Sequence, residues 1–270
     1  MSLNVAVLGA AGKMGRAIVR ALGETGGRAR LAAAIEGAGN PACGKDAGDL
    51  AGVGALGVLV ESTHAAAIAA KAAVWIDFTA PAATVDAARR AAAAGAGMVI
   101  GTTGLSTADR AAIADAAARV PVVLAPNMSA GVNVLLRLVA DAARALGPAY
   151  DLEIVETHHR AKRDAPSGTA LGIAQALADA TGRDLGSAAR TARQGDIGPR
   201  ADGEIGIQTV RGGDVIGDHS VFFLGQGERI EITHRASSRD TFARGAVRAA
   251  LWAADKKPGL YDMRDVLGLK

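Results

Sequence analysis

The sequence predicts an α/β fold: a Rossmann-like, doubly wound parallel sheet, followed by an α+β domain with an open mixed sheet. Strand-like and helix-like runs alternate through the first half of the chain, an order typical of parallel sheets because each crossover helix covers a face of the sheet. From Gly203 onward, three strand-like runs follow one another across glycine-containing turns, which is typical of an open antiparallel or mixed sheet. With 270 residues and 50% hydrophobic side chains, the chain is long enough for both domains.

A glycine-rich turn follows the first predicted strand. The apolar run from Leu3 to Leu8 leads into Gly-Ala-Ala-Gly-Lys-Met-Gly at positions 9–15, and a helical pattern continues to Leu22. Strand, glycine turn and helix are typical of a dinucleotide site, because glycines let the backbone approach a pyrophosphate and the helix N-terminus attracts its charge. The spacing is G-x-x-G-x-x-G, not the commoner G-x-G-x-x-G, and turn geometry alone also explains an isolated glycine motif.

An acidic residue ends the second predicted strand. Residues 30–35 are strand-like, and Glu36 follows about 20 residues past the last glycine of the turn, where an acid hydrogen-bonds ribose hydroxyl groups. Gly37 comes next, and no arginine stands in the following several residues to bind a 2′-phosphate. Because Glu36 repels a phosphate, we predict that NADH is used at least as well as NADPH. Lys13, or a basic residue distant in sequence, could still support NADPH.

Three further strands and two helices complete the predicted parallel sheet. They occupy, in order, residues 74–78 (strand), 82–94 (helix), 97–100 (strand), 107–118 (helix) and 120–124 (strand). Loops at the carboxyl ends of parallel strands face the ligand, and here they are residues 78–81, 101–104 and 125–128. Each loop is small, polar or glycine-rich, which suits contact with nicotinamide and ribose, although an ordinary turn would explain any one of them.

A basic segment, residues 158–169, reads His-His-Arg-Ala-Lys-Arg-Asp-Ala-Pro-Ser-Gly-Thr. It follows a helix predicted over 132–146 and a strand predicted over 151–156. The two histidines lie at the end of this strand, so His158 and His159 would face opposite sides of the sheet. The segment gathers protonatable bases beside a predicted helix start, which indicates a site that holds a small dianion and supplies a proton. A solvated basic loop is the alternative for such a charge run.

The helix start at the end of the basic segment is marked by its residue types. Pro166 precludes a helix before it, and Ser167 can cap the amphipathic run 170–177. Gly168 and Thr169 would then lie in the first turn, where free backbone N–H groups point at an anion.

The last part of the chain supplies the remaining strands of the second domain. Strands are predicted over 204–210, 215–224 and 229–234, followed by a helix over 241–254 and a short apolar segment over 263–267. We place the change of domain near Met128. An open sheet leaves faces and edges that need covering, which favours association into an oligomer.

Composition argues against several classes of function. The net charge is only +3, with basic residues scattered among acidic ones, so nucleic acid is a poor partner. The single Cys43 precludes an internal disulfide, and without clustered Cys or His the sequence shows no metal pattern. The N-terminus lacks the features of a secretory signal, and no uninterrupted apolar stretch reaches about 18 residues. We therefore expect a soluble, cytoplasmic protein with no metal, nucleic-acid or membrane partner.

Together these motifs resemble the 4-hydroxy-tetrahydrodipicolinate reductase family, also called dihydrodipicolinate reductases, of the bacterial and plant diaminopimelate and lysine pathway. The resemblance runs essentially end to end and is carried by residues 7–15, 76–79, 99–104, 127–133 and 156–170. The last of these motifs is highly specific to the family.

The resemblance implies a homotetramer assembled through the second domain, with the C-terminal segment returning to the first. It thus assigns residues 1–128 and 239–270 to a dinucleotide-binding domain and residues 129–238 to a substrate-binding and tetramerisation domain. The cofactor contacts that it implies are Gly9, Ala10, Ala11, Gly12, Lys13, Met14, Glu36, Gly101, Thr102, Thr103, Ala125, Pro126, Asn127 and Met128. Many bacterial members carry an arginine where this chain has Gly37, a departure that weakens the expectation of an NADPH contact.

The resemblance also implies roles for the basic segment. His158 would be the principal acid/base, and His159 and Lys162 would contact the substrate, with Lys162 a second proton donor. Gly168 and Thr169 would form a cradle for a carboxylate.

The implied reaction is hydride transfer from NADH or NADPH to C4 of a small cyclic dicarboxylate, followed by protonation. Histidine suits the donor role because its unperturbed pKa lies near neutral pH. If the strand prediction is right, Glu156 lies on the same face as His158 and could keep the imidazole protonated. Two alternatives stay open: another dehydrogenase of amino-acid metabolism, and an NAD(H)-binding redox sensor without turnover.

Overall fold

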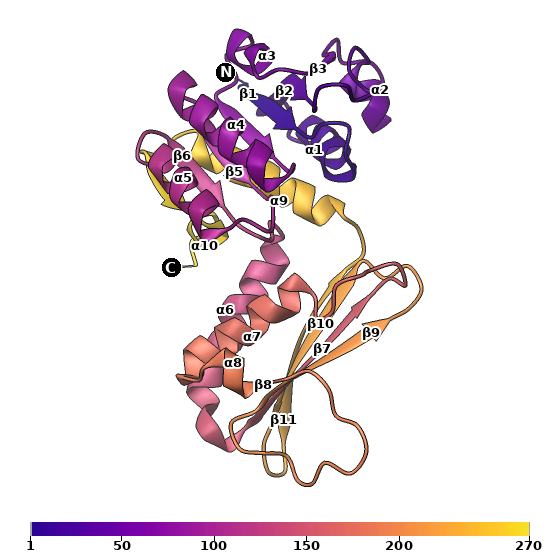
Figure 1. The fold of residues 1–270 in the computed structure, drawn as a ribbon, viewed down its shortest axis with the longest axis vertical. Helices are drawn as coiled ribbons and strands as arrows, with labels where there is room; N and C mark the ends of the chain where they lie inside the picture. Colours follow the sequence, from indigo (N-terminus) through magenta and orange to yellow (C-terminus); the bar gives the residue numbers. More distant parts are fainter. Residues whose placement is uncertain (1, 270) are drawn as a thin grey trace. The chain divides into compact units, whose positions relative to one another are not determined.

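The computed structural model describes residues 2–269, which fold as two compact units (Figure 1). One unit takes the chain up to residue 130 together with the segment from residue 239, and the other takes residues 131–238. Each unit has its own sheet and its own hydrophobic core. The dinucleotide-binding role of the first and the substrate-binding and tetramerisation role of the second stay predictions at this point.

The first unit is built on a seven-stranded sheet of order β12-β6-β5-β4-β1-β2-β3, in which every pairing is parallel. The predicted doubly wound parallel sheet is therefore confirmed. Its strands are β1 Leu3–Leu8, β2 Ala29–Ile35, β3 Val60–Glu61, β4 Val74–Asp77, β5 Gly97–Ile100, β6 Pro121–Leu124 and β12 Gly259–Tyr261. The sequence patterns did not reveal β3 and β12, because runs of two and three residues are too short to show a period.

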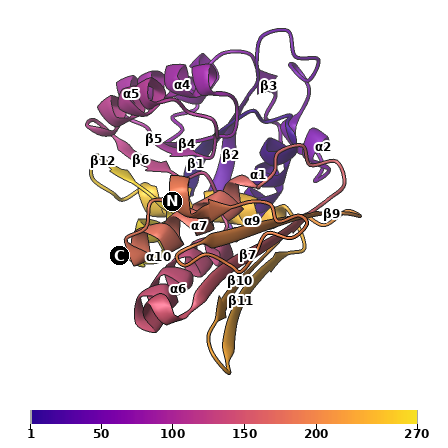
Figure 2. The same ribbon diagram turned by 60° about the horizontal axis from the view of Figure 1, so that its bottom comes forward.

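Helices cover both faces of this sheet, as Figure 2 shows. They are α1 Lys13–Gly23, α2 Ala47–Ala51, α3 Ala65–Ala69, α4 Pro81–Ala94, α5 Thr107–Ala117, α9 Asp240–Ala253 and α10 Met263–Leu267. One apolar cluster joins α1 and α9 to the sheet, and a second joins α4 and α5 to its other face. Strand order reverses between β1 and β4, and such a switch point opens a crevice for ligands at the carboxyl ends of the strands.

The second unit has a five-stranded sheet of order β11-β10-β7-β9-β8. Strand β10 is antiparallel to β7 and β11, whereas β9 is parallel to β7 and β8, so the predicted mixed sheet is confirmed. The elements are α6 Ala130–Leu146, η1 Gly147–Ala149, β7 Asp151–His158, α7 Gly168–Thr181, α8 Leu185–Ala188, β8 Ala189–Arg190, β9 Ile205–Arg211, β10 Gly217–Leu224 and β11 Arg229–Ala236.

Burial alternates strictly along β7, and this places the candidate acid. Leu152, Ile154, Glu156 and His158 are buried, while the residues between them are exposed or half-buried. Leu152 and Ile154 belong to the apolar core that α6 and α7 form with the sheet. Because side chains alternate between faces with a period of two, Glu156 and His158 continue this core-facing row, as the sequence predicted.

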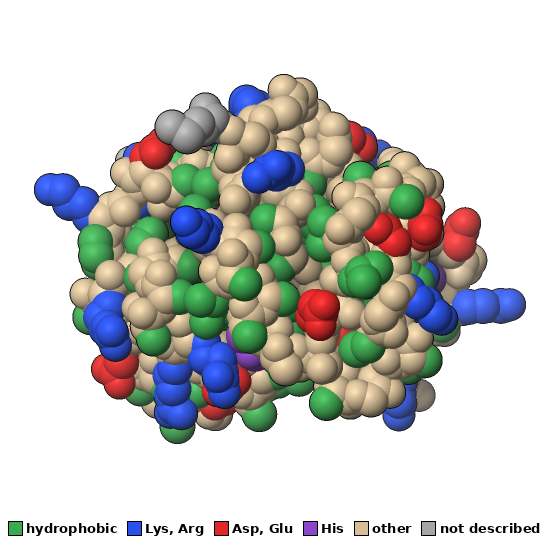
Figure 3. All heavy atoms as spheres, turned by 90° about the horizontal axis from the view of Figure 1, so that it is seen from above, with side chains coloured by type: hydrophobic (Ala, Val, Ile, Leu, Met, Phe, Trp, Pro, Cys, Tyr) green, Lys and Arg blue, Asp and Glu red, His purple; other side chains and the backbone are tan. Residues whose placement is uncertain are grey.

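Two further observations bear on function. None of the helices within residues 2–269 is long and apolar enough to cross a membrane. Basic and acidic side chains lie scattered among neutral ones on the face shown in Figure 3.

Candidate active site

The glycine turn after β1 needs glycine because other backbone lies close to it. Gly9 has a φ of +74°, and a Cβ at this position would lie 2.9 Å from the carbonyl oxygen of Phe78. A Cβ at Gly15 would lie 2.1 Å from the carbonyl oxygen of Gly9. Helix α1 therefore packs tightly under the turn. Gly12 is its N-cap and provides no side-chain cap, which leaves the first-turn N–H groups oriented for an anion.

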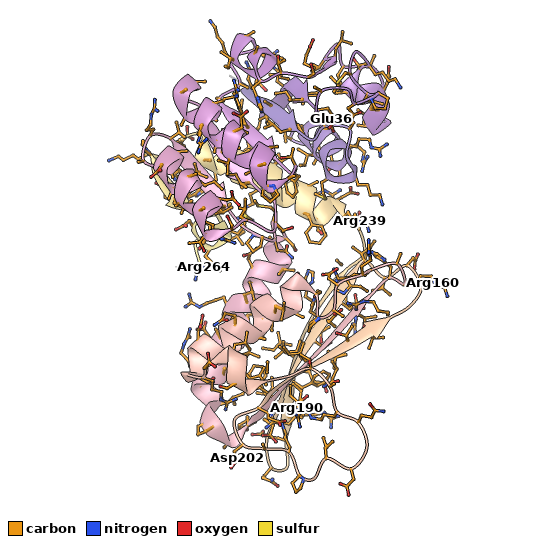
Figure 4. The ribbon with its side chains drawn as sticks, viewed as in Figure 1. Glu36, Arg160, Arg190, Asp202, Arg239 and Arg264 are labelled. Carbon is orange, nitrogen blue, oxygen red and sulfur yellow. The ribbon has the colours of Figure 1, made fainter. Side chains whose placement is uncertain are left out.

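Glu36, which Figure 4 labels, holds the glycine turn from the end of β2. Its carboxylate accepts hydrogen bonds from the backbone N–H of Ala11 at 2.9 Å and of Gly37 at 3.3 Å, and from the side-chain amide of Asn40 at 3.2 Å. The structure thus brings the predicted acid against the predicted turn.

A cavity of about 160 Å³ adjoins Glu36 at the carboxyl edge of the sheet. Its lining residues are Leu8, Gly9, Ile35, Glu36, Gly37, Ser62, His64, Thr79 and Ala83. The His64 ring stacks on Trp75 with 5.6 Å between the ring centroids. Ser62 and His64 escaped the sequence analysis because they follow the two-residue strand β3, which carries no readable pattern.

Asp77 connects the predicted loops 78–81 and 101–104 through hydrogen bonds. This fully buried carboxylate accepts hydrogen bonds from the hydroxyl groups of Thr79 at 2.6 Å, Thr102 at 3.0 Å and Thr84. The Thr102 hydroxyl in turn accepts from the backbone N–H of Thr79 at 3.1 Å. Burial raises the pKa of Asp77 above its ordinary value, although the three hydroxyl donors oppose the shift.

The remaining predicted cofactor residues lie in the loops that follow β5 and β6. In the first, Gly101 lets the Phe78 ring approach: a Cβ there would lie 2.3 Å from ring carbons. In the second, the side-chain oxygen of Asn127 accepts from the backbone N–H of Ser129 at 2.9 Å. Because β1, β4, β5 and β6 are parallel neighbours, these loops and the glycine turn share one edge of the sheet.

In the second unit, Glu156 is the centre of a buried polar cluster. Its carboxylate accepts from the backbone N–H of Ser167 at 3.0 Å and from the hydroxyl of Thr209 at 3.2 Å. Both terminal nitrogens of Arg211 donate to it, at 2.7 and 2.8 Å. Burial alone would raise the pKa of Glu156, but the hydrogen bonds from Arg211 and His158 outweigh it and lower the pKa to about 2.

His158 contacts Glu156 through Nδ1, at 2.6 Å from Oε2. The prediction that the two side chains share a face is confirmed, but the expected consequence is wrong. Burial lowers the pKa of His158 and outweighs the opposing effect of Glu156, and the nearby charges of Lys162 and Arg211 act in the same direction as burial. His158 is therefore more readily neutral than an ordinary histidine, with Nδ1–H donating to the ionised Glu156 and Nε2 left as the reactive nitrogen.

The loop after β7 carries the other predicted substrate residues. Lys162 donates from Nζ to both carboxylate oxygens of Asp164, at 2.9 Å each, and its backbone N–H donates to the carbonyl oxygen of His159 at 3.0 Å. His159 is half-buried, and Arg160 extends from the loop into solvent (Figure 4).

Ser167 caps α7 as predicted, and the helix begins at Gly168. The Ser167 hydroxyl accepts from the backbone N–H of Ala170 and lies 3.1 Å from Nε2 of His219. Gly168 is exposed and Thr169 half-buried at the start of the helix. No sequence pattern singled out His219, whose ring lies edge-on to that of His158 with the ring centroids 5.2 Å apart.

No group of three or more potential metal-binding side chains occurs within residues 2–269. The groups suited to chemistry are instead an imidazole, an ammonium group and first-turn amides in one unit, and a glycine turn with hydroxyl-lined loops in the other.

Comparison with known proteins accounts for both units. The family models "Dihydrodipicolinate reductase, N-terminus" and "Dihydrodipicolinate reductase, C-terminus" match residues 3–128 and 131–267. The 4-hydroxy-tetrahydrodipicolinate reductase of Anaeromyxobacter dehalogenans strain 2CP-1 is 56% identical over 267 residues, or 99% of this chain and 98% of that protein.

Solved structures share the fold over nearly all of the chain. The dipicolinate-bound dihydrodipicolinate reductase from Paenisporosarcina sp. TG-14 matches with a TM-score of 0.77 at 24% identity, covering 97% of this chain and 98% of that one. GenD2 from gentamicin A biosynthesis, in complex with NAD, matches with a TM-score of 0.59 at 18% identity, covering 99% and 91%. The family models and the 56% identical relative establish more than the fold: this chain belongs to the dihydrodipicolinate reductase family.

Proposed function

We propose that this protein reduces 4-hydroxy-tetrahydrodipicolinate to tetrahydrodipicolinate with NADH or NADPH, in lysine and diaminopimelate biosynthesis. Family membership and the name of the 56% identical relative support the reaction. The observation that carries the proposal is the contact of His158 with the buried, ionised Glu156, beside the start of α7. We infer that the imidazole of His158 exchanges the proton and that the first-turn amides of α7 bind a carboxylate.

The glycine turn fits a dinucleotide, because glycine at positions 9 and 15 lets the turn and α1 pack closely, and the first-turn amides of α1 have no side-chain cap. Residues 9–14, Glu36, and the loops 101–103 and 125–128 would hold the cofactor, which supplies the hydride when bound. Glu36 lies at a cavity next to Gly9, where a ribose hydroxyl is a better partner for a carboxylate than a phosphate.

His158 must take up a proton before it can donate one. A bound dicarboxylate favours the charged imidazolium, because opposite charges nearby raise the pKa of a histidine. Lys162 and the amides of Gly168 and Thr169 would bind the two carboxylates, and His159 would contact the substrate. Once the ring has accepted hydride, His158 protonates it from Nε2, with Lys162 as a second donor.

We further propose a cytoplasmic homotetramer assembled through the second unit, whose mixed sheet has one face that the helices of that unit leave partly exposed. Sedimentation of the purified protein measures the state directly. A monomer at micromolar concentration would contradict this assembly while leaving the activity unaffected.

The test of function is a coupled assay. Pyruvate, aspartate semialdehyde and the preceding synthase generate the substrate, and loss of reduced nicotinamide absorbance is followed with NADH and with NADPH at equal concentration. We expect turnover with NADH at least as fast as with NADPH, and Glu36→Gln should improve the relative rate with NADPH. No loss of absorbance with either cofactor would refute the reductase assignment, and a strong NADPH preference would refute the role of Glu36.

A further inference from the structure

Arg211 ends β9 directly beside the candidate acid. Strand β9 runs parallel to β7, and the register pairs Arg211 with His158. The guanidinium binds both oxygens of Glu156, with Nη1 at 2.7 Å from Oε2 and Nη2 at 2.8 Å from Oε1. Two parallel charge-assisted bonds fix a carboxylate in orientation as well as in charge.

This pair determines which nitrogen of His158 carries a proton. Oε2 of Glu156 is shared between Arg211 and Nδ1 of His158, while Oε1 accepts from Ser167 and Thr209. An ionised carboxylate can only accept, so Nδ1 must donate. Nε2 then faces away from the cluster, against Gly217, where a Cβ would lie 3.0 Å from it.

The same guanidinium also holds the loop that carries Lys162. Nη2 of Arg211 donates to the carbonyl oxygen of Asp164 at 2.8 Å, and the carboxylate of Asp164 accepts from Nζ of Lys162. Arg211 therefore contacts both Glu156, which binds the imidazole of His158, and Asp164, which binds the ammonium group of Lys162. Lysine has a single point charge and cannot make this forked set of contacts.

We propose that Arg211 is a positioning residue for the reaction, orienting His158 through Glu156 and placing Lys162 through the backbone of Asp164. This inference rests on the proposed reductase function and adds to it a residue that acts through Glu156 and Asp164. Its two contacts have separable consequences. The contact with Glu156 affects proton transfer, and the contact with Asp164 affects binding of the dicarboxylate.

Three variants separate these consequences: Arg211→Met, Arg211→Lys, and Arg211→Met combined with Glu156→Gln. Arg144→Met is the matched control, because Arg144 pairs with Asp141 on the exposed side of α6. For each protein, kcat and KM for the dicarboxylate are measured across pH, together with NADH binding by fluorescence and folding by circular dichroism.

We expect Arg211→Met to lower kcat by ~10- to 100-fold, less than the ~10²- to 10⁴-fold typical of losing the acid itself, and to raise KM. Arg211→Lys keeps a positive charge beside Glu156 and should recover part of kcat, but it should keep the raised KM because the Asp164 carbonyl loses its donor. NADH binding and Arg144→Met should match wild type.

The pH profile provides a readout that a merely structural role would not change. Arg211, His158 and His219 act electrostatically on Glu156 or it on them, and the charge of Lys162 acts on both histidines. Arg211 makes the largest contribution that lowers the pKa of Glu156. In Arg211→Met, Glu156 should therefore take up a proton at a higher pH, and activity should fall at the acidic end where wild type stays active.

Several outcomes would overturn the inference. Unchanged kcat, KM and pH profile in Arg211→Met and Arg211→Lys would do so. If Arg211→Met fails to fold, the double variant decides, because it removes the buried carboxylate charge together with its partner; wild-type turnover in that variant would refute the positioning role. An inactive wild type would instead refute the reductase function.

Discussion

The two candidate regions differ in the charge of their hydrogen-bond donors, and two buried carboxylates show the difference. Asp77 and Glu156 are both fully buried, so burial raises the pKa of each. Asp77 has only hydroxyl donors, and its pKa stays raised. Glu156 has a guanidinium and an imidazole, and its pKa falls to about 2. The charge of the hydrogen-bond partners therefore decides in which direction the pKa of these two buried acids shifts.

This difference corresponds to what the proposed function requires of each region. Around the glycine turn, close backbone packing and neutral hydroxyls shape a surface for a ligand that brings its own charge. Around Glu156, an ionised acid is needed because only an acceptor without a proton forces the tautomer of His158. Variants in the two regions should therefore fail in different ways.

The largest expected effect is the loss of His158. His158→Gln should lower the rate by ~10²- to 10⁴-fold, the usual contribution of a positioned acid, because an amide cannot supply the proton. NADH binding should remain as in wild type, since the glycine turn belongs to the other unit. Steady-state rates and a fluorescence titration with NADH measure both. Equal rates in His158→Gln and wild type would remove His158 from the mechanism.

Glu156→Gln comes next and tests the charged cluster by stability. Removing one partner of a buried ion pair costs about 3–5 kcal/mol, and we expect a loss of about 3 kcal/mol because the Arg211 side chain is 20% exposed. Urea unfolding measures the change. The control Glu231→Gln breaks an exposed pair with Arg229 and should cost at most about 1 kcal/mol. An equal, small loss in both variants would mean that Glu156 is not a structural anchor.

The stability of the wild-type protein at low pH should also depend on the cluster around Glu156. A carboxylate whose folded-state pKa is depressed stabilises the fold above its unfolded pKa, and that stability is lost as pH falls through the folded value. For Glu156 the folded value is about 2, so its contribution should decline only between the ordinary glutamate range and pH near 2. Glu156→Gln should lack this part of the acid transition.

Local parts of both regions could be predicted from the sequence because their signals are local. The glycine turn, the Ser167 cap and the two-residue spacing of Glu156 and His158 each lie within one short segment. The partners lie far away in sequence: Arg211 follows Glu156 by 55 residues, and its strand was predicted without any indication of its register beside β7. Register depends on which side chains pack together across strands, and alternation alone does not fix it.

The pKa of His158 shows a second limit of sequence reasoning. A carboxylate two residues away on one strand face indicates a raised pKa, and the contact exists. Burial reverses the direction, and burial depends on α7 and β10 closing over the site. The family resemblance supplied residue roles for the basic segment, but it indicated neither this protonation state nor the hydroxyl cluster around Asp77.

The glycine turn should be sensitive to added side-chain volume, whereas the cluster around Glu156 should be sensitive to the loss of charge. Gly15→Ala places a methyl group 2.1 Å from the carbonyl oxygen of Gly9, and such overpacking typically costs about 1–3 kcal/mol. Gly23→Ala, at the other end of α1, meets no atom within 4 Å and should be neutral or slightly stabilising. Thermal unfolding and NADH affinity compare the two. Equal melting temperatures and affinities would show that the turn accommodates a Cβ at position 15 despite the short distance to Gly9.

The smallest expected effect is that of Asp77→Asn, and its sign sharpens the contrast with Glu156. A raised folded-state pKa means that the fold loses stability as pH rises through that pKa, because the buried carboxylate must then ionise with hydroxyl groups as its hydrogen-bond donors. The asparagine oxygen can still accept from the hydroxyls of Thr84 and Thr102, and its amide can donate to Thr79. At neutral pH we therefore expect a change within about 1 kcal/mol, neutral or stabilising, and less dependence of stability on pH than in wild type. Urea unfolding at several pH values measures this, with Asp115→Asn on the exposed side of α5 as the control. A loss as large as that of Glu156→Gln would show that hydroxyl donors stabilise the Asp77 carboxylate as strongly as Arg211 stabilises that of Glu156.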